Sequence, residues 1–191
     1  RGLATRRIQA SGVPYHLVLL QLQHYSALQT HSPFSNNAEF LDQVLCGFAQ
    51  GAPDHHQLVV KGHPLEQNGE ALSAMLKNLA KKHQIKDRLR YIEGGKLAKI
   101  LQQARSAVTV NSTTGQQALW RGIPLKLFGD AVYAKAEFAS SQEISDFLLP
   151  RADLTPKPII CSGAIYWKHH KSQAAFIPEK RGDSSFGWWW I

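Results

Sequence analysis

The sequence predicts an α/β fold, a Rossmann-like parallel sheet with helices on both faces. Strand-type apolar runs alternate with helical segments between residues 15 and 128, which is the pattern of a parallel sheet. The strand runs are apolar almost throughout, as in strands that helices cover on both faces. With 191 residues and 43% hydrophobic content, the chain can form one domain with an appendage. We expect an N-terminal remnant or linker over residues 1–14, the Rossmann-like domain over 15–150 and a C-terminal extension over 151–191.

The individual elements follow from hydrophobic periodicity and turn residues. Residues 15–22 are a continuous apolar run and are expected to form the first strand, followed by a polar loop over 23–37. The later strands are predicted over 58–61, 90–93, 107–110 and 125–128, and the helices over 38–50, 68–84, 96–104, 115–121 and 142–149.

Composition restricts the kinds of partner. The chain has 22 Lys and Arg residues against 14 Asp and Glu residues, a net charge of +8, which favours an acidic partner such as a nucleotide, a polyanionic glycan or an anionic membrane face. The basic residues are scattered and no nucleic-acid motif is present, so we do not expect binding to DNA or RNA. Residues 21–26, after the first strand, contain no Gly-x-Gly, which argues against an NAD site.

Cysteine and histidine usage does not indicate a metal site. Cys46 and Cys161 are too few for a disulfide framework or a metal cage, which fits a reducing cytoplasm. The adjacent pair His55-His56 lacks acidic or Cys partners, so no metal is expected. No apolar run approaches the roughly 20 residues of a transmembrane helix. We expect a cytoplasmic protein, at most peripheral at the inner membrane.

Polar residues follow two of the predicted strands. Hydroxyl groups and a glycine that permits close backbone approach come after strand 107–110, and the first-turn N–H groups of the next helix would face an anion there. A cation and a histidine come after strand 58–61. A hydroxyl-rich cap is often only a cap, but ligands gather at the carboxyl ends of strands in such sheets. The residues concerned are Asn111, Ser112, Thr113, Thr114 and Gly115, and Lys61, His63 and Pro64.

Four segments in order along the chain carry a family resemblance: Leu20 to Pro33, Val59 to Leu65, Val110 to Gly115 and Gly122 to Tyr133. Their motifs resemble those of the bacterial capsular polysaccharide biosynthesis and export family, which is similar to Kdo transferases. The resemblance covers about residues 15–150. It implies a glycosyltransferase of GT-B-like architecture, of which this chain is the C-terminal, nucleotide-binding half.

The donor implied by the resemblance is CMP-Kdo, with no cofactor and no metal. His63, beside Pro64, would contact the phosphate or ribose, while Ser112 and Thr113 would hydrogen-bond the phosphate and Lys61 would pair with the Kdo carboxylate. The loop after the first strand would line the sugar side. Its candidate substrate-binding residues are His24, His31 and Ser32.

One position departs from the family pattern. Members commonly carry an acidic residue just before the serine of the first motif, where this chain has Tyr25 before Ser26. A phenol ionises at about pH 10 and does not replace a carboxylate. The catalytic candidates are therefore Tyr25, Ser26 and Glu66, with Asp130 as a further acid. Alternatively, the N-terminal half supplies the acid, or the chain binds without turnover.

Other functions stay open. A scaffold for capsule assembly or export would bind polysaccharide or anionic lipid, together with other capsule-assembly proteins. Another nucleotide-sugar enzyme of GT-B architecture would present a similar pocket. For a Kdo transferase, the acceptor would be a lipid-linked or Kdo-terminated glycan. Because the chain starts at Arg1 and ends on Gly187-Trp-Trp-Trp-Ile191, we expect a fragment of a longer protein.

Overall fold

The structure is a computed structural model that describes residues 3–21, 32–66, 68–134, 139–149, 159–161 and 164–166. The chain divides into two compact units, Arg1–Leu154 and Thr155–Ile191. In the second unit, β7 (Ile159–Cys161) pairs antiparallel with β8 (Ala164–Tyr166). All other described elements belong to the first unit.

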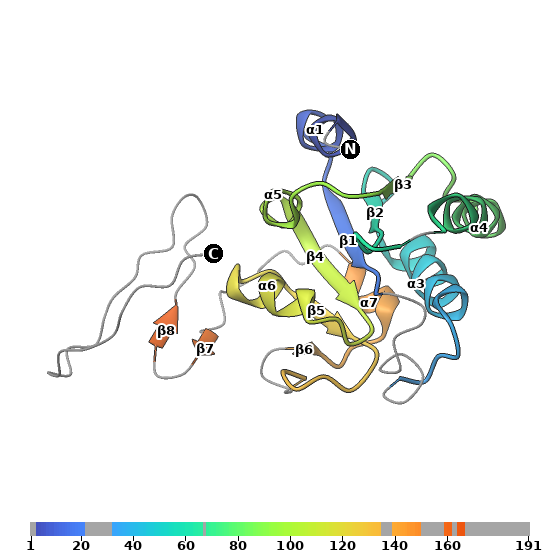
Figure 1. The fold of residues 1–191 in the computed structure, drawn as a ribbon. Coiled ribbons are helices and arrows are strands. Elements are labelled where there is room, and N and C mark those ends of the chain that lie inside the picture. Colours follow the sequence, from blue (N-terminus) through green and yellow to red (C-terminus); the bar gives the residue numbers. More distant parts are fainter. Residues whose placement is uncertain are drawn as a thin grey trace, which may run out of the picture. The chain divides into compact units, whose positions relative to one another are not determined.

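The first unit contains a sheet in the order β3-β2-β1-β4-β5-β6, and every neighbouring pair is parallel (Figure 1). This confirms the predicted Rossmann-like parallel sheet. From β1 the chain continues to β2 on one side, and from β4 it continues to β5 on the other. The order therefore reverses between β1 and β4, where ligands of such sheets bind. The strands are β1 (Tyr15–Leu19), β2 (Gln57–Lys61), β3 (Leu89–Ile92), β4 (Ala104–Thr109), β5 (Leu125–Leu127) and β6 (Ala139–Ser140).

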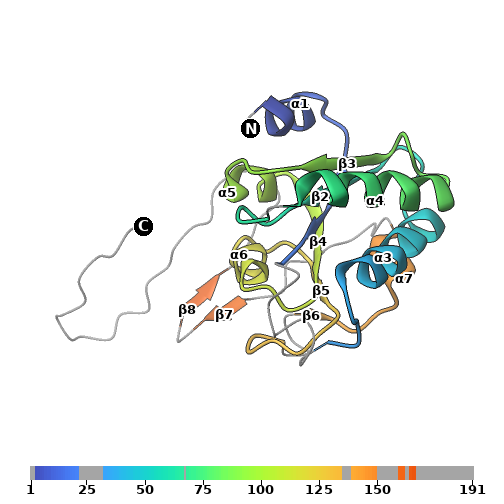
Figure 2. The ribbon, with the colours of Figure 1, turned by 45° about the vertical axis from the view of Figure 1, so that its right-hand side comes forward.

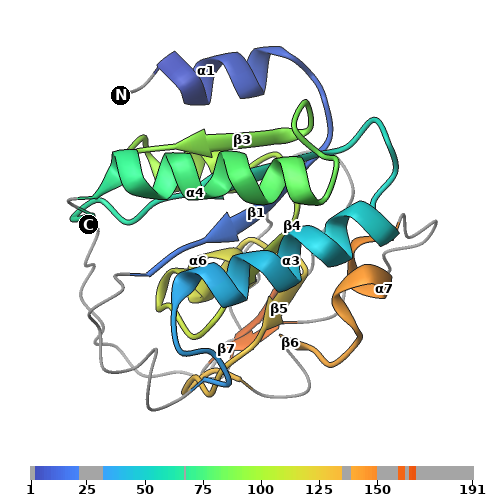
Figure 3. The same cartoon turned by 90° about the vertical axis from the view of Figure 1, so that its right-hand side faces the viewer.

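Helices cover both faces of the sheet, as expected (Figures 2 and 3). The side chains of β1 alternate between two core clusters. Leu17 and Leu19 pack with residues of α1, α5 and α6, while Val18 packs with residues of α3, α4 and α7. The helices are α1 (Leu3–Ala10), α3 (Asn37–Gly51), α4 (Gly69–Lys82), α5 (Leu97–Leu101), α6 (Thr114–Trp120) and α7 (Ile144–Leu148).

Several boundaries differ from the prediction. The helix predicted over 96–104 ends at Leu101, and the next strand starts at Ala104 rather than at residue 107. The hydrophobic pattern did not predict this start because Ser106 is polar. In the structure Ser106 is buried, and its Oγ lies 2.8 Å from His16 Nδ1. Within residues 1–14, expected to be a remnant or linker, α1 buries Ile8 in the core. Strand β6 was not predicted.

The start of α3 fixes the segment that leads back from the loop after β1. Asn36 caps the helix by accepting from the N–H groups of Ala38 and Glu39, at 2.9 and 3.0 Å. Glu39 Oε2 in turn accepts from the N–H of Ser35 at 2.9 Å. Local hydrogen bonds among residues 35–39 therefore fix the start of α3.

Candidate functional site

The carboxyl edge of the sheet brings together the turns that follow β2 and β4. Backbone hydrogen bonds tie the strand ends beyond the regular ladders: Leu20 N–H donates to Lys61 O at 3.1 Å, and Gly129 N–H donates to Val110 O at 3.0 Å. Both β2 and β4 are neighbours of β1, so they lie about 10 Å apart at two strand spacings. One nucleotide can bridge that separation.

A hydrogen bond within the turn after β2 fixes the tautomer of the neutral His63 imidazole. Leu65 N–H donates to His63 Nδ1 at 3.2 Å, and Glu66 N–H donates to His63 O at 3.0 Å. Because Nδ1 accepts, the neutral ring carries its proton on Nε2. Pro64 is exposed within the same turn. The turn therefore presents one N–H donor from a half-buried histidine at the edge of the sheet.

The turn after β4 organises hydroxyl groups. Ser112 Oγ lies 2.8 Å from Thr114 Oγ1 and accepts from Thr114 N–H at 3.3 Å. When Thr114 Oγ1 donates in this pair, the Ser112 proton is left for a ligand. Thr113 is exposed beside it, and Asn111 is half-buried before it. This turn can donate hydroxyl hydrogen bonds to an anion.

The backbone of this turn differs from the sequence expectation. The first N–H groups of α6 were expected to face an anion, but Gly115 N–H donates to Ser112 O at 2.9 Å and Gln116 N–H donates to Thr113 O at 3.1 Å. Thr113 is the N-cap residue and makes no side-chain capping bond. Such i-to-i+3 bonds tighten the first turn. Hydroxyl groups, rather than these amides, are the donors that the turn offers.

Lys61 is buried at the end of β2, with 6% of its surface exposed. Its Nζ donates to Gly94 O at 2.9 Å, which ties it to the turn after β3. Burial lowers the pKa of Lys61. An ammonium group has three donors, so Lys61 keeps capacity for a second acceptor.

Acidic residues lie on both sides of the switch point. Glu66 is half-buried, and its Oε1 accepts from Asn68 N–H at 3.2 Å. Burial, with the negative charges of Glu93 and Glu66, raises the pKa of Tyr91 to about 12. The Glu66 and Glu93 carboxylates therefore lie near the Tyr91 hydroxyl, close to the carboxyl ends of β2 and β3. Asp130 is exposed after β5.

Sequence analysis did not single out two buried amide side chains, Gln21 after β1 and Asn37 at the start of α3. Asn37 Nδ2 donates to Gln21 O at 3.2 Å, while Asn37 Oδ1 and Gln21 Nε2 are buried without a hydrogen-bond partner among the described residues. A buried polar atom left unpaired costs about 1–3 kcal/mol. At the switch point, a bound ligand can supply such partners. No periodicity reveals these residues, since only the tertiary fold buries them.

The loop after β1 is described only at its end. His24, Tyr25, Ser26 and His31 lie outside the described residues, so their assignments stay predictions. Ser32 Oγ accepts from Phe34 N–H at 3.2 Å, and Phe34 packs on Phe128 with ring centroids 5.6 Å apart. Ser32 thus lies near the end of β5.

Within the described parts of the chain, no three His, Cys, Asp or Glu side chains gather in an arrangement that could hold a metal ion. The same parts contain no helix long and apolar enough to cross a membrane.

Two curated proteins are similar to this chain in sequence. KpsS of Escherichia coli, a capsule polysaccharide export protein, is 31% identical over 119 residues, which are 62% of this chain and 31% of KpsS. LipB of Neisseria meningitidis serogroup A, a capsule polysaccharide modification protein, is 28% identical over 134 residues, 70% of this chain and 32% of LipB. The chain spans about a third of the length of these curated relatives.

A solved structure shares the fold. Thermosulfurimonas dismutans KpsC, a β-Kdo 2,7 transferase, superposes with a TM-score of 0.51 over 78% of this chain and 52% of KpsC, at 15% identity. The match supports the expected Rossmann-like architecture of GT-B glycosyltransferases. The family model described as "Capsule polysaccharide biosynthesis protein" matches residues 2–165. The chain therefore belongs to the capsule polysaccharide biosynthesis protein family.

Proposed function

We propose that this chain is the CMP-Kdo-binding part of a Kdo transferase in capsule biosynthesis. The observation that carries the proposal is the placement of the His63 and Ser112 turns at one sheet edge, on either side of β1. Family membership supports a role in capsule synthesis, and the fold shared with a β-Kdo transferase supports the reaction class. Its acceptor is a lipid-linked or Kdo-terminated glycan, and it works in the cytoplasm or at the inner membrane.

The chemistry needs donors for a departing phosphate. In Kdo transfer, the bond from the Kdo anomeric carbon to the CMP phosphate oxygen breaks, a bond to the acceptor hydroxyl oxygen forms, and the hydroxyl proton passes to a base. CMP gains negative charge as it leaves, and the His63 Nε2–H and Ser112 hydroxyl groups are suited to stabilise that charge. Glu66, after β2, and Asp130, after β5, are the acids that we propose as the base. Tyr25 stands where family members commonly carry an acid, and its role in catalysis stays a prediction.

Binding measurements test this proposal. Calorimetry should show that the chain binds CMP in preference to UMP, GMP and AMP without added metal. His63→Ala and Ser112→Ala should each weaken CMP binding by about 1–3 kcal/mol, because each removes a hydrogen bond to a charged group. His55→Ala, which changes an exposed residue before the start of β2 and so away from the carboxyl edge, should leave it unchanged. Equal affinity for all four nucleotides would overturn the cytidine assignment.

A second function, docking on an anionic surface, is favoured by the charge distribution. Residues 1–38 and 94–129 contain no Asp or Glu, and these segments supply α1, α5 and α6. One face of the sheet is therefore covered by helices with basic but no acidic residues. This arrangement suits a capsule-assembly protein that works at an anionic membrane.

A further inference from the structure

We infer that Tyr133 is a positioning residue for the turn that carries Ser112, an inference that rests on the donor-binding role proposed above. The Tyr133 hydroxyl donates to the Ser112 carbonyl oxygen, 21 residues earlier in the chain. The same carbonyl also accepts from Gly115 N–H at 2.9 Å. Two donors from different segments thus fix the orientation of this peptide group, and with it the direction of the Ser112 side chain.

Gly115 shows how closely the phenol approaches the turn. A Cβ atom at Gly115 would lie 2.5 Å from the Tyr133 hydroxyl oxygen and 3.1 Å from its Cζ. The first of these distances is shorter than any normal non-bonded contact with carbon. Glycine at this position makes room for Tyr133, a reason that the sequence alone does not reveal.

The segment that carries Tyr133 is itself anchored along β4. Phe128 N–H donates to Thr109 O at 3.2 Å, and Ala134 N–H closes a turn onto Ala131 O at 2.7 Å. Val132 points outward with 99% of its surface exposed, whereas Tyr133 is partly buried. Burial raises the pKa of Tyr133 to about 12, so the phenol keeps its proton at neutral pH. Residues 128–134 therefore form a strap from the end of β5 to the Ser112 turn.

The chain offers a matched control for the loss of this bond. The Tyr15 hydroxyl donates to the Ile100 carbonyl oxygen, and burial raises the pKa of Tyr15 to about 12. This bond also joins a phenol to a main-chain carbonyl, but it lies at the start of β1, at the opposite edge of the sheet. Tyr15→Phe thus removes a similar bond without touching the Ser112 turn.

Hydrogen exchange tests the positioning role directly. In Tyr133→Phe, the amides of residues 113–116 should exchange about three- to tenfold faster than in the unaltered chain, whereas Tyr15→Phe should leave their rates unchanged. Gly115→Ala should destabilise the fold by crowding the phenol. Adding Tyr133→Phe to Gly115→Ala should restore part of that loss, because the crowded atom is gone. Unchanged exchange in Tyr133→Phe would overturn the inference.

Ligand binding then separates this inference from the proposed function. Tyr133→Phe should weaken CMP binding about three- to tenfold and leave binding of cytidine, which has no phosphate, unchanged. Tyr15→Phe should change neither affinity. Equal CMP affinities in the two variants would overturn the role of Tyr133 in donor binding. If the unaltered chain does not bind CMP, the proposed function fails, and the exchange rates alone decide whether Tyr133 positions the turn.

Discussion

His16 in β1 and His56 just before β2 form a buried pair at the amino edge of the sheet, opposite the candidate site. His16 Nε2 lies 2.9 Å from His56 Nδ1, and His16 Nδ1 lies 2.8 Å from Ser106 Oγ. Both rings are at least nine-tenths buried. Burial, then the charge of a neighbouring histidine (His56 for His16, His55 for His56) and those of Arg105 and Arg88, lower the pKa of His16 from 6.5 to about 3 and that of His56 from 6.5 to about 4. Both imidazoles are therefore neutral in the folded protein at neutral pH.

This pair predicts a loss of stability in mild acid. Below the unfolded pKa of 6.5, the unfolded chain binds protons that the folded pair does not, so the free energy of unfolding falls as pH decreases towards about 4. The expected slope is about 1.4 kcal/mol per pH unit for each such proton. Urea unfolding between pH 7.5 and 5 measures it.

Variants assign this pH dependence to the pair. His16→Gln should flatten the decline, because one titrating group is removed from the buried cluster. His55→Gln removes an exposed neighbour whose charge only adds to the lowering of the His56 pKa, so it should flatten the decline less than His16→Gln does. A free energy of unfolding that stays constant from pH 7.5 to 5 in the unaltered chain would contradict the assignment.

At the scale of elements, the contact between α3 and α7 depends on two glycines. A Cβ atom at Gly51 would lie 2.0 Å from the Ser145 carbonyl oxygen, and one at Gly47 would lie 2.3 Å from Ile144 Cγ2. The partner of Gly51 is backbone, which cannot move aside as a side chain can. The close approach buries Ile144 and Phe147 against α3 on the face that also contains Val18.

Gly51→Ala should therefore destabilise the chain by about 1–3 kcal/mol, the usual cost of overpacking a well-packed contact. Thermal or urea unfolding measures the change. Ala49→Gly, at an exposed position of the same helix, gives the bare propensity difference and should cost about 0.5–1 kcal/mol. Gly51→Ala protein as stable as the unaltered chain would show that the two helices do not pack this closely.

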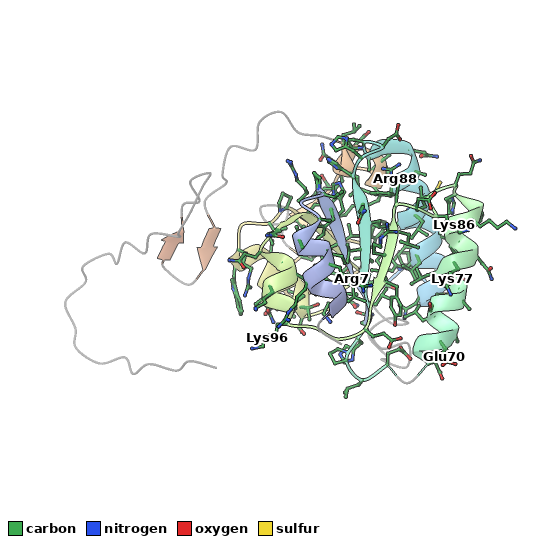
Figure 4. All side chains as sticks on the ribbon, turned by 90° about the horizontal axis from the view of Figure 1, so that it is seen from above. Arg7, Glu70, Lys77, Lys86, Arg88 and Lys96 are labelled. Atoms are coloured by element: carbon green, nitrogen blue, oxygen red, sulfur yellow. The ribbon has the colours of Figure 1, made fainter. Side chains whose placement is uncertain are left out.

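At the scale of the whole first unit, charge is divided between the two faces of the sheet. Arg6 and Arg7 on α1 and Lys96 before α5 are exposed on a face whose helices have no acidic residue, and Trp120 at the end of α6 is 61% exposed. The opposite face carries both signs. Figure 4 labels Arg7 and Lys96 on the first face, with Lys77 and Glu70 on α4.

This asymmetry predicts binding to anionic vesicles through the α1 and α5 face. Each basic residue near such a surface contributes about 1 kcal/mol, so Arg6→Glu with Arg7→Glu should lower binding to phosphatidylglycerol vesicles at least about tenfold. The pair Lys77→Glu and Lys81→Glu changes the net charge equally on α4 and should have a smaller effect. Co-sedimentation at low and high salt provides the measurement, since salt screens the attraction. Equal losses of vesicle binding in the two double variants would show that binding depends on net charge and not on the α1 and α5 face.

The class of fold, and the position of the turns after β2 and β4, follow from the sequence pattern alone. Apolar strands alternating with amphipathic helices leave few arrangements other than a parallel sheet covered on both faces, and the structure confirms it. The same alternation sends every strand's carboxyl end to one edge. His63 and Ser112, which follow β2 and β4, therefore lie at that edge.

The side chains that hold this edge together become apparent only in the folded structure. Gln21 and Asn37 are ordinary polar residues in the sequence, and their burial arises where the start of α3 meets the end of β1. Tyr133 acquires its partner because β5 returns beside β4, which places its hydroxyl on Ser112. Sequence patterns report which face a residue prefers, through its hydrophobicity and period. Hydrogen bonds between distant segments depend instead on the strand order and on close packing, which local periodicity does not encode.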